Sequence, residues 1–162
     1  MSKAGGVKLV HSVRMMLEQR PDFICAKLDF ANAFNSVARA RIIRELAKHP
    51  TLSHLAQHAA IVLAPSNGLE SGGRLWGEAS EGTTQGDPES GAYFCIAMQE
   101  FVVEADRRLA EAGGFARFGW DDGYLLGPPE LVYPVLDWFS EQVQLQFGLG
   151  IQRVKTNRST EL

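Results

Sequence analysis

Long apolar runs are absent from this sequence. No stretch approaches the roughly 20 apolar residues that a membrane-spanning helix needs, and no charged-then-apolar leader resembles a secretion signal. Repeats, low-complexity tracts and internal linkers are missing as well. We therefore expect an intracellular protein of the cytoplasm or nucleus, without a membrane partner. At 162 residues, the chain is long enough for one domain with a hydrophobic core.

Cysteine is also scarce. Cys25 and Cys95 are the two cysteines, and both lie in apolar segments without the spacing of metal ligands. This pattern favours buried free thiols in a reducing compartment over a disulfide.

An excess of positive charge is missing too. The 16 Lys and Arg residues are outnumbered by 19 Asp and Glu residues, which gives a net charge of −3. Nucleic-acid-binding proteins usually carry excess Lys and Arg to contact phosphates. A metal-binding core would be locally acidic, however, and basic grooves could belong to segments outside this chain.

Apolar spacing in the first half of the sequence predicts three helices and a strand. One helix covers residues 8–19, and a strand follows over residues 23–29. In the strand, alternation places Lys27 and Asp29 on the face opposite the apolar residues. Ser36 is expected to cap a helix that runs to about Lys48, and another helix covers residues 52–64.

The second half of the sequence predicts a loop, two helices, a hairpin and a last strand. Glycines 68, 72 and 73 mark the loop, and residues 74–81 favour extended structure. Asp87 is predicted to cap a helix that Gly113-Gly114 ends. Residues 115–127 indicate a hairpin with Asp122-Gly123 in its turn, and a helix after Pro128-Pro129 stops at Gly148. A short strand then holds Leu149 and Ile151, so we expect an α+β sandwich, an antiparallel sheet backed by helices on one face.

Acidic side chains fall at the ends of predicted strands that are far apart in the sequence. Asp29 ends an apolar strand, and Asp121-Asp122 lies at the predicted hairpin tip. Carboxylates on neighbouring strands can hold two divalent metal ions against the attacking and leaving oxygens of a phosphoryl-transfer reaction. Hard cations such as Mg²⁺ take oxygen ligands of this kind. The pattern therefore indicates a nucleotidyltransferase metal site.

Four motifs resemble those of reverse transcriptases, in the order and rough spacing of that family, especially the non-LTR retrotransposon branch. The motifs are Lys27–Val37, Gly82–Ser90, Trp120–Asp122 and Gly148–Thr156. The resemblance implies a reverse-transcriptase palm with part of the fingers region, over residues 1–162. The N-terminal fingers motifs and the thumb of the family are missing from it.

This resemblance also implies an activity, RNA-directed DNA polymerisation by a retroelement. The cofactor would be two Mg²⁺ ions, with Mn²⁺ as an alternative. The partners would be an RNA template, a DNA primer, deoxynucleoside triphosphates and the remainder of a larger polyprotein.

The site residues implied by the resemblance have two roles. The two essential metal ligands of the catalytic site would be Asp29 and Asp121, with Asp122 beside them in a supporting role. The residues expected to bind the nucleotide are Phe30, Phe34, Gln85, Gly86 and Lys155. Phe34 would exclude a 2′-hydroxyl, which disfavours an RNA-templated polymerase that makes RNA, and Lys155 would neutralise or protonate the departing pyrophosphate.

Each of these residues also has a structural explanation. Asp29 can end a strand, Phe34 can fill a core, and Gln85-Gly86 can form the turn before a helix. A lysine near a chain end such as Lys155 is usually exposed. Four arginines can either contact phosphates or lie on solvated helix faces, namely Arg14, Arg39, Arg41 and Arg44.

The two residues before the aspartate pair differ from the family pattern. Gly119 stands where the family usually has an aromatic residue, and Trp120 stands where it has a small or slender one. This departure, the acidic charge and the missing flanks motivate an alternative function. In that alternative, the chain is a catalytically decayed or scaffold domain of the reverse-transcriptase type.

Overall fold

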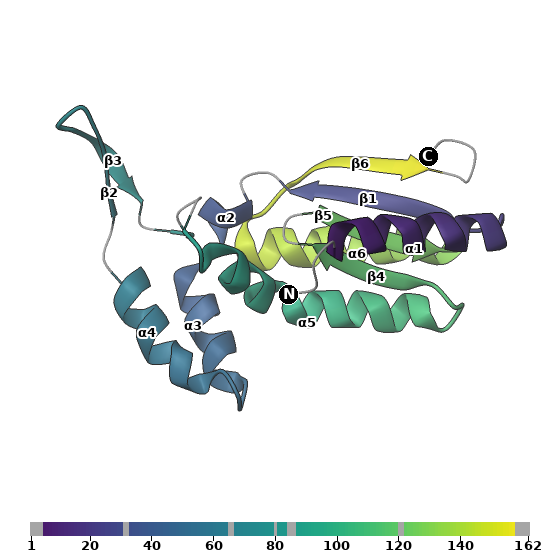
Figure 1. The fold of residues 1–162 in the computed structure, drawn as a ribbon, viewed down its shortest axis with the longest axis horizontal. Helices are drawn as coiled ribbons and strands as arrows, with labels where there is room; N and C mark the ends of the chain where they lie inside the picture. The colour runs from purple at the N-terminus through teal and green to yellow at the C-terminus, as the bar shows by residue number, and fades with distance from the viewer. Residues whose placement is uncertain are drawn as a thin grey trace. The chain divides into compact units, whose positions relative to one another are not determined.

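The computed structural model describes residues 5–30, 33–64, 67–79, 81–83, 87–119 and 122–157 (Figure 1). The chain divides into two compact units. The first unit consists of Met1–Ala31, Gln99–Gln146 and Gly150–Leu162. The second unit consists of Asn32–Met98 and Phe147–Leu149.

The first unit contains a four-stranded sheet with helices. Its helices are α1 (Gly5–Gln19), the second half of α5 (Ser90–Ala110) and nearly all of α6 (Pro129–Phe147). Its strands are β1 (Ile24–Phe30), β4 (Phe115–Gly119), β5 (Asp122–Gly127) and β6 (Ile151–Asn157). They are ordered β4-β5-β1-β6 and every neighbouring pair is antiparallel, which confirms the predicted α+β class.

The second unit is built from short helices and a hairpin. Its helices are α2 (Ala33–Ser36), α3 (Arg39–Lys48), α4 (Ser53–Leu63) and the first half of α5. Its hairpin pairs β2 (Asn67–Ser71) with β3 (Arg74–Ala79). Gly72 and Gly73 make the turn with φ of 61° and 75°, a left-handed conformation that glycine adopts without a steric penalty. Extended structure was thus predicted correctly for β3, whereas Gly68 lies within β2 instead of a loop.

One face of the sheet is apolar and covered by α5 and α6. Ile24, Ala26 and Leu28 of β1 share this face and are each at most 2% exposed. The space beside Gly127 of β5 is filled by Leu109 of α5 and by Val132 of α6. The predicted backing of the sheet by helices on this face is therefore confirmed.

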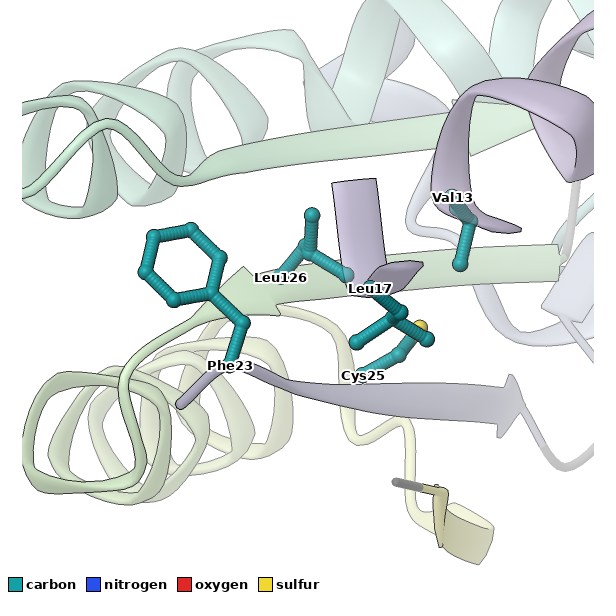
Figure 2. Close-up of a cluster of buried hydrophobic side chains, with 5 residues drawn as sticks. All are labelled: Val13, Leu17, Phe23, Cys25 and Leu126. Carbon is teal, nitrogen blue, oxygen red and sulfur yellow. The ribbon is translucent and has the colours of Figure 1, made fainter. Parts of the chain in front are cut away.

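Helix α1 packs on one end of the opposite face. Five buried side chains form a cluster there, and Figure 2 shows them on α1, on β1 and the residue just before it, and on β5: Val13, Leu17, Phe23, Cys25 and Leu126. Periodicity predicted α1 but gave no indication of what it covers.

The two cysteines lie in different environments. Burial raises the pKa of the Cys25 thiol to about 11, so this thiol stays protonated at neutral pH. Neither of these two cysteines forms a disulfide, as predicted, but Cys95 is exposed and the expectation that it is buried is wrong.

Capping predictions for two helices had opposite outcomes. Ser36 does not cap a helix running to Lys48, because it ends α2 and α3 begins separately at Arg39. At the start of α5, Oδ1 of Asp87 accepts a hydrogen bond from the Glu89 N–H at 3.1 Å, which is the bond expected of a helix-capping carboxylate. None of the described helices combines the length and apolar content needed to cross a bilayer.

The hairpin predicted over residues 115–127 is present, but its turn is elsewhere. Gly119 pairs with Asp122, so Asp122 and Gly123 are the first residues of β5. Gly123 pairs with Leu28 on one side and with Phe118 on the other. A Cβ atom at position 123 would collide with the Phe118 ring, so the glycine is explained by packing and the predicted Asp122-Gly123 turn is wrong.

Replacement of Gly123 by alanine should destabilise the chain. The Phe118 ring would have to move, although it stacks against Phe139 with ring centroids 5.2 Å apart. We expect the free energy of unfolding to fall by about 1–3 kcal/mol, as for other overpacked cores. Chemical denaturation measures this change. Gly119→Ala is the matched control in the same hairpin, because nothing lies within 4 Å of its added Cβ atom, and an equal loss in both variants would contradict the packing role.

Candidate active site

Two of the predicted metal ligands lie directly opposite each other on neighbouring strands. Asp29 of β1 and Asp122 of β5 are register partners in the antiparallel ladder. Residues paired in this way project from the same face of a sheet, with Cβ atoms about 4.5–5.5 Å apart. Asp29 is exposed, and the Asp122 side chain is 50% exposed. The two carboxylates therefore share an open part of the sheet face on which α1 packs further along.

A lysine on the same face contacts one of these carboxylates. Nζ of Lys27 lies 3.0 Å from Oδ1 of Asp122 and 5.7 Å from the centre of the Tyr124 ring. The hydrogen bond to Asp122 raises the pKa of the Lys27 ammonium, so this group remains charged at neutral pH. Like charges directly opposite each other destabilise a sheet. Lys27 offsets this repulsion between Asp29 and Asp122.

The strand register arranges this face in two adjacent rows. The row that contains both carboxylates runs from Gly119 through Asp122 to Asp29, whose backbone partner on β6 is Arg153. The next row runs from Arg117 through Tyr124 to Lys27, whose backbone partner on β6 is Lys155. Sequence reasoning identified both acids but missed Lys27, although it had placed Lys27 on the same face as Asp29.

The carboxylate oxygens of Asp29 and Asp122 are ligands that suit a hard divalent cation. Mg²⁺ is usually bound through one or two carboxylates, water and substrate phosphates, and the exposed Asp29 and Asp122 leave room for such ligands. Within the described ranges, no group of three or more His, Cys, Asp and Glu side chains is placed to hold a metal ion. Asp121, the third predicted ligand, lies outside the described residues.

The other predicted nucleotide-binding residues have varied positions. Phe30 is 5% exposed on the helix-covered face, where its ring lies 6.3 Å from those of Phe118 and Phe139, so packing accounts for it. Lys155 lies on β6, and its Cα atom pairs with that of Lys27. Gln85 and Gly86 lie outside the described residues.

Phe34 belongs to the second unit, where its backbone is anchored to the start of another predicted motif. Its ring is half-buried with its centre 5.5 Å from that of Phe94. Its carbonyl oxygen accepts hydrogen bonds from the Thr83 N–H at 2.7 Å and the Thr83 hydroxyl at 3.2 Å. Gly82 has φ of 67°, and a Cβ atom there would collide with the backbone of Asn35. Residues 82 and 83 therefore fix the backbone that carries Phe34.

Arg39 strengthens this anchor. Its guanidinium donates to the carbonyl oxygen of Gly82 through Nε and to that of Leu63 through Nη1, each at 2.9 Å. Arg41 is 8% exposed, and its guanidinium lies 5.0 Å from the centre of the Phe147 ring. Neither arginine lies on a solvated helix face, contrary to one of the two interpretations of the sequence, whereas Arg14 and Arg44 are exposed.

The chain resembles solved structures of telomerase. No protein-family profile matches it, and no curated protein matches it in sequence. An apo telomerase from Candida tropicalis matches 97% of the chain with a TM-score of 0.69 and 12% identity. The telomerase of Candida albicans in complex with the TWJ fragment of telomeric RNA matches 99% of it, with a TM-score of 0.67 and 12% identity. A C. tropicalis telomerase truncated from its C-terminal domain matches 96% of it, with a TM-score of 0.60 and 12% identity.

These matches show the fold. The chain spans about a third of each telomerase, covering 32%, 31% and 35% of their lengths in the same order. Because the sequences are only 12% identical, the likeness is one of backbone architecture. The chain therefore has a reverse-transcriptase-like fold.

Replacement of Arg39 by methionine should loosen the second unit. The change removes two charge-assisted hydrogen bonds and leaves the carbonyl oxygens of Gly82 and Leu63 without this donor. We expect the free energy of unfolding to fall by about 2 kcal/mol, as measured by denaturation, together with faster hydrogen exchange at the Thr83 amide. Arg44→Met, on the exposed side of the same helix, is the control. Equal effects of the two variants would refute the anchoring role.

Proposed function

We propose that this chain is the catalytic palm of an RNA-directed DNA polymerase. It would transfer deoxynucleotides onto a primer 3′-hydroxyl while an RNA template directs their order. The pairing of Asp29 with Asp122 on an exposed sheet face is the observation that carries the proposal. The reverse-transcriptase-like fold supports it. The assignment to a retrotransposon rests on the sequence motifs alone, because the matched structures are telomerases.

The carboxylates would act by holding two Mg²⁺ ions, or Mn²⁺ in their place. Bound there, such ions activate the primer hydroxyl and neutralise the charge on the departing pyrophosphate. Asp29 and Asp122 would be ligands, with Asp121 as the third. The sheet contributes preorganisation, because its register fixes both strands before any ligand binds and little reorganisation is left for the reaction itself.

The nucleotide would be contacted by side chains from several motifs. Phe34 would lie against its sugar and exclude a 2′-hydroxyl, while Gln85 and Gly86 would pack against the nucleotide and the template base. Lys155 would neutralise or protonate the pyrophosphate from its place on β6, in register with Lys27. The RNA template and DNA primer would also contact parts of a larger polyprotein.

Loss of Asp29 or of Asp121 should severely slow polymerisation. We expect Asp29→Asn and Asp121→Ala each to slow primer extension at least about a hundredfold, because metal ligands supply several kcal/mol of transition-state stabilisation. The assay uses a protein that joins this chain to fingers and thumb segments. Asp137→Asn, which changes an exposed acid on α6, should leave the rate unchanged. Primer extension at the normal rate by Asp29→Asn would refute the proposal. If the unsubstituted protein does not extend a primer, the alternative of a catalytically decayed or scaffold domain is favoured.

Shortening of Phe34 should relax the choice of sugar. Removing the half-buried ring opens space where a 2′-hydroxyl would otherwise be excluded. We expect Phe34→Ala to raise ribonucleotide incorporation relative to deoxynucleotide incorporation about tenfold or more. Single-nucleotide extension kinetics with each substrate measure this ratio. Phe94→Leu, which alters the neighbouring ring but keeps Phe34, is the control, and an unchanged ratio in Phe34→Ala would remove Phe34 from the sugar site.

A further inference from the structure

The proposed metal site contains a positively charged side chain, that of Lys27. The ammonium of Lys27 lies 3.0 Å from Oδ1 of Asp122 and has a half-exposed side chain, as does Asp122. A metal ion bound at Asp122 would use the same carboxylate group. An ammonium at hydrogen-bonding distance and a metal ion at coordination distance repel each other, since both are positive and only a few ångströms apart.

We propose that Lys27 is the built-in counter-ion of this metal site. It neutralises the two opposed carboxylates while no ion is bound, and it must leave Asp122 when a divalent cation binds there. This inference rests on the proposed function and adds a residue to it that the four motifs do not assign to metal binding. Lys27 acts through Asp122, so it is a positioning residue and not a catalytic one.

The surroundings of Lys27 allow such a displacement. Its side chain is 40% exposed, so the ammonium can turn away from Asp122 into water without being buried. The Tyr124 ring in the same row, 5.7 Å from Nζ, offers an alternative favourable contact for the cation. Exposed ion pairs are also weak. Lys27 can therefore hold Asp122 in the metal-free protein without blocking ions permanently.

Arg117 provides a matched control. It occupies the same row on β4 and is exposed. Its Nη1 atom, however, lies 2.6 Å from Oδ1 of Asp106 on α5, away from Asp122. Removal of the Arg117 charge therefore tests the general effect of one cation fewer in the sheet, whereas removal of the Lys27 charge tests direct competition for Asp122.

The first experiment measures Mn²⁺ affinity of the full chain by electron paramagnetic resonance. We expect Lys27→Met to tighten binding by roughly threefold to tenfold, because no ammonium has to be displaced. Arg117→Met should change it by less than about twofold, and Asp122→Asn should weaken it. If Asp122→Asn weakens binding but Lys27→Met leaves it unchanged or weaker, the counter-ion role is overturned while the metal site stands. If wild-type binding does not depend on Asp29 or Asp122, both the metal site and its counter-ion are refuted.

A second experiment needs no substitution of Lys27. Nuclear magnetic resonance of labelled lysine side chains follows the Lys27 ammonium while Mg²⁺ is added to the wild-type chain. We expect its signal to move as the site fills and to stay in place in Asp122→Asn. A Lys27 signal that does not move while Mg²⁺ saturates the site would overturn the proposal, whether or not Lys27→Met folds.

Discussion

The pairing of β1 with β5 is the interaction on which the rest of this structure depends. It places two carboxylates opposite each other, although like charges in that position weaken a sheet. The stability of the pair comes from the opposite face, where Ala26, Leu28 and Leu125 are fully buried. Each strand thus carries apolar contacts along one face and a single acidic side chain at one end of the other face. The unfavourable arrangement of charge is tolerated because burial on the far side holds the register.

In the second unit, hydrogen bonds to backbone carbonyl oxygens hold a predicted functional residue, Phe34, in position. Thr83 and Gly82 bond to the carbonyl oxygen of Phe34 and Val37, respectively, and Arg39 joins Gly82 to the end of α4. Two segments separated by more than 40 residues in sequence are therefore connected by hydrogen bonds to backbone carbonyl oxygens. In the first unit, Asp122 has an expected catalytic role and is followed by Gly123, whose contact with Phe118 is structural. In the second unit, Phe34 has an expected role in nucleotide binding, and its carbonyl oxygen makes a structural contact with Thr83.

Local patterns in the sequence predicted much of this fold. Alternation in β1 correctly placed Asp29 away from Ile24, Ala26 and Leu28. The capping role of Asp87 was also predicted, because a carboxylate before proline acts on its immediate neighbours. Features set by distant residues were missed. The dipeptide Asp122-Gly123 favours a turn, but Gly123 is required by the ring of Phe118.

In the candidate site, too, features set by neighbouring residues were predicted and features set by distant residues were missed. Both acids were found from motifs, since each motif is a short local segment. The contact between Lys27 and Asp122 depends on which residues the strand register brings together, and 94 intervening positions separate them. The interpretation of Arg39 and Arg41 as residues of solvated helix faces was wrong for a similar reason. Arg39 donates to the carbonyl oxygen of Gly82, and Arg41 lies over the ring of Phe147. Helical spacing within residues 39–48 cannot reveal partners so distant in the sequence.

The close approach of Gly123 to Phe118 has a consequence for the register in which β5 pairs with its neighbouring strands. A shift of β5 by one residue against its neighbours would exchange the faces of Asp122 and Gly123. A carboxylate would then meet the aromatic cluster of Phe118, Phe30 and Phe139, where an unpaired charge is poorly solvated. The misaligned hairpin is therefore disfavoured by desolvation as well as by lost packing. Gly123, which admits the ring, and Asp122 beside it therefore both favour the observed alignment of the strands.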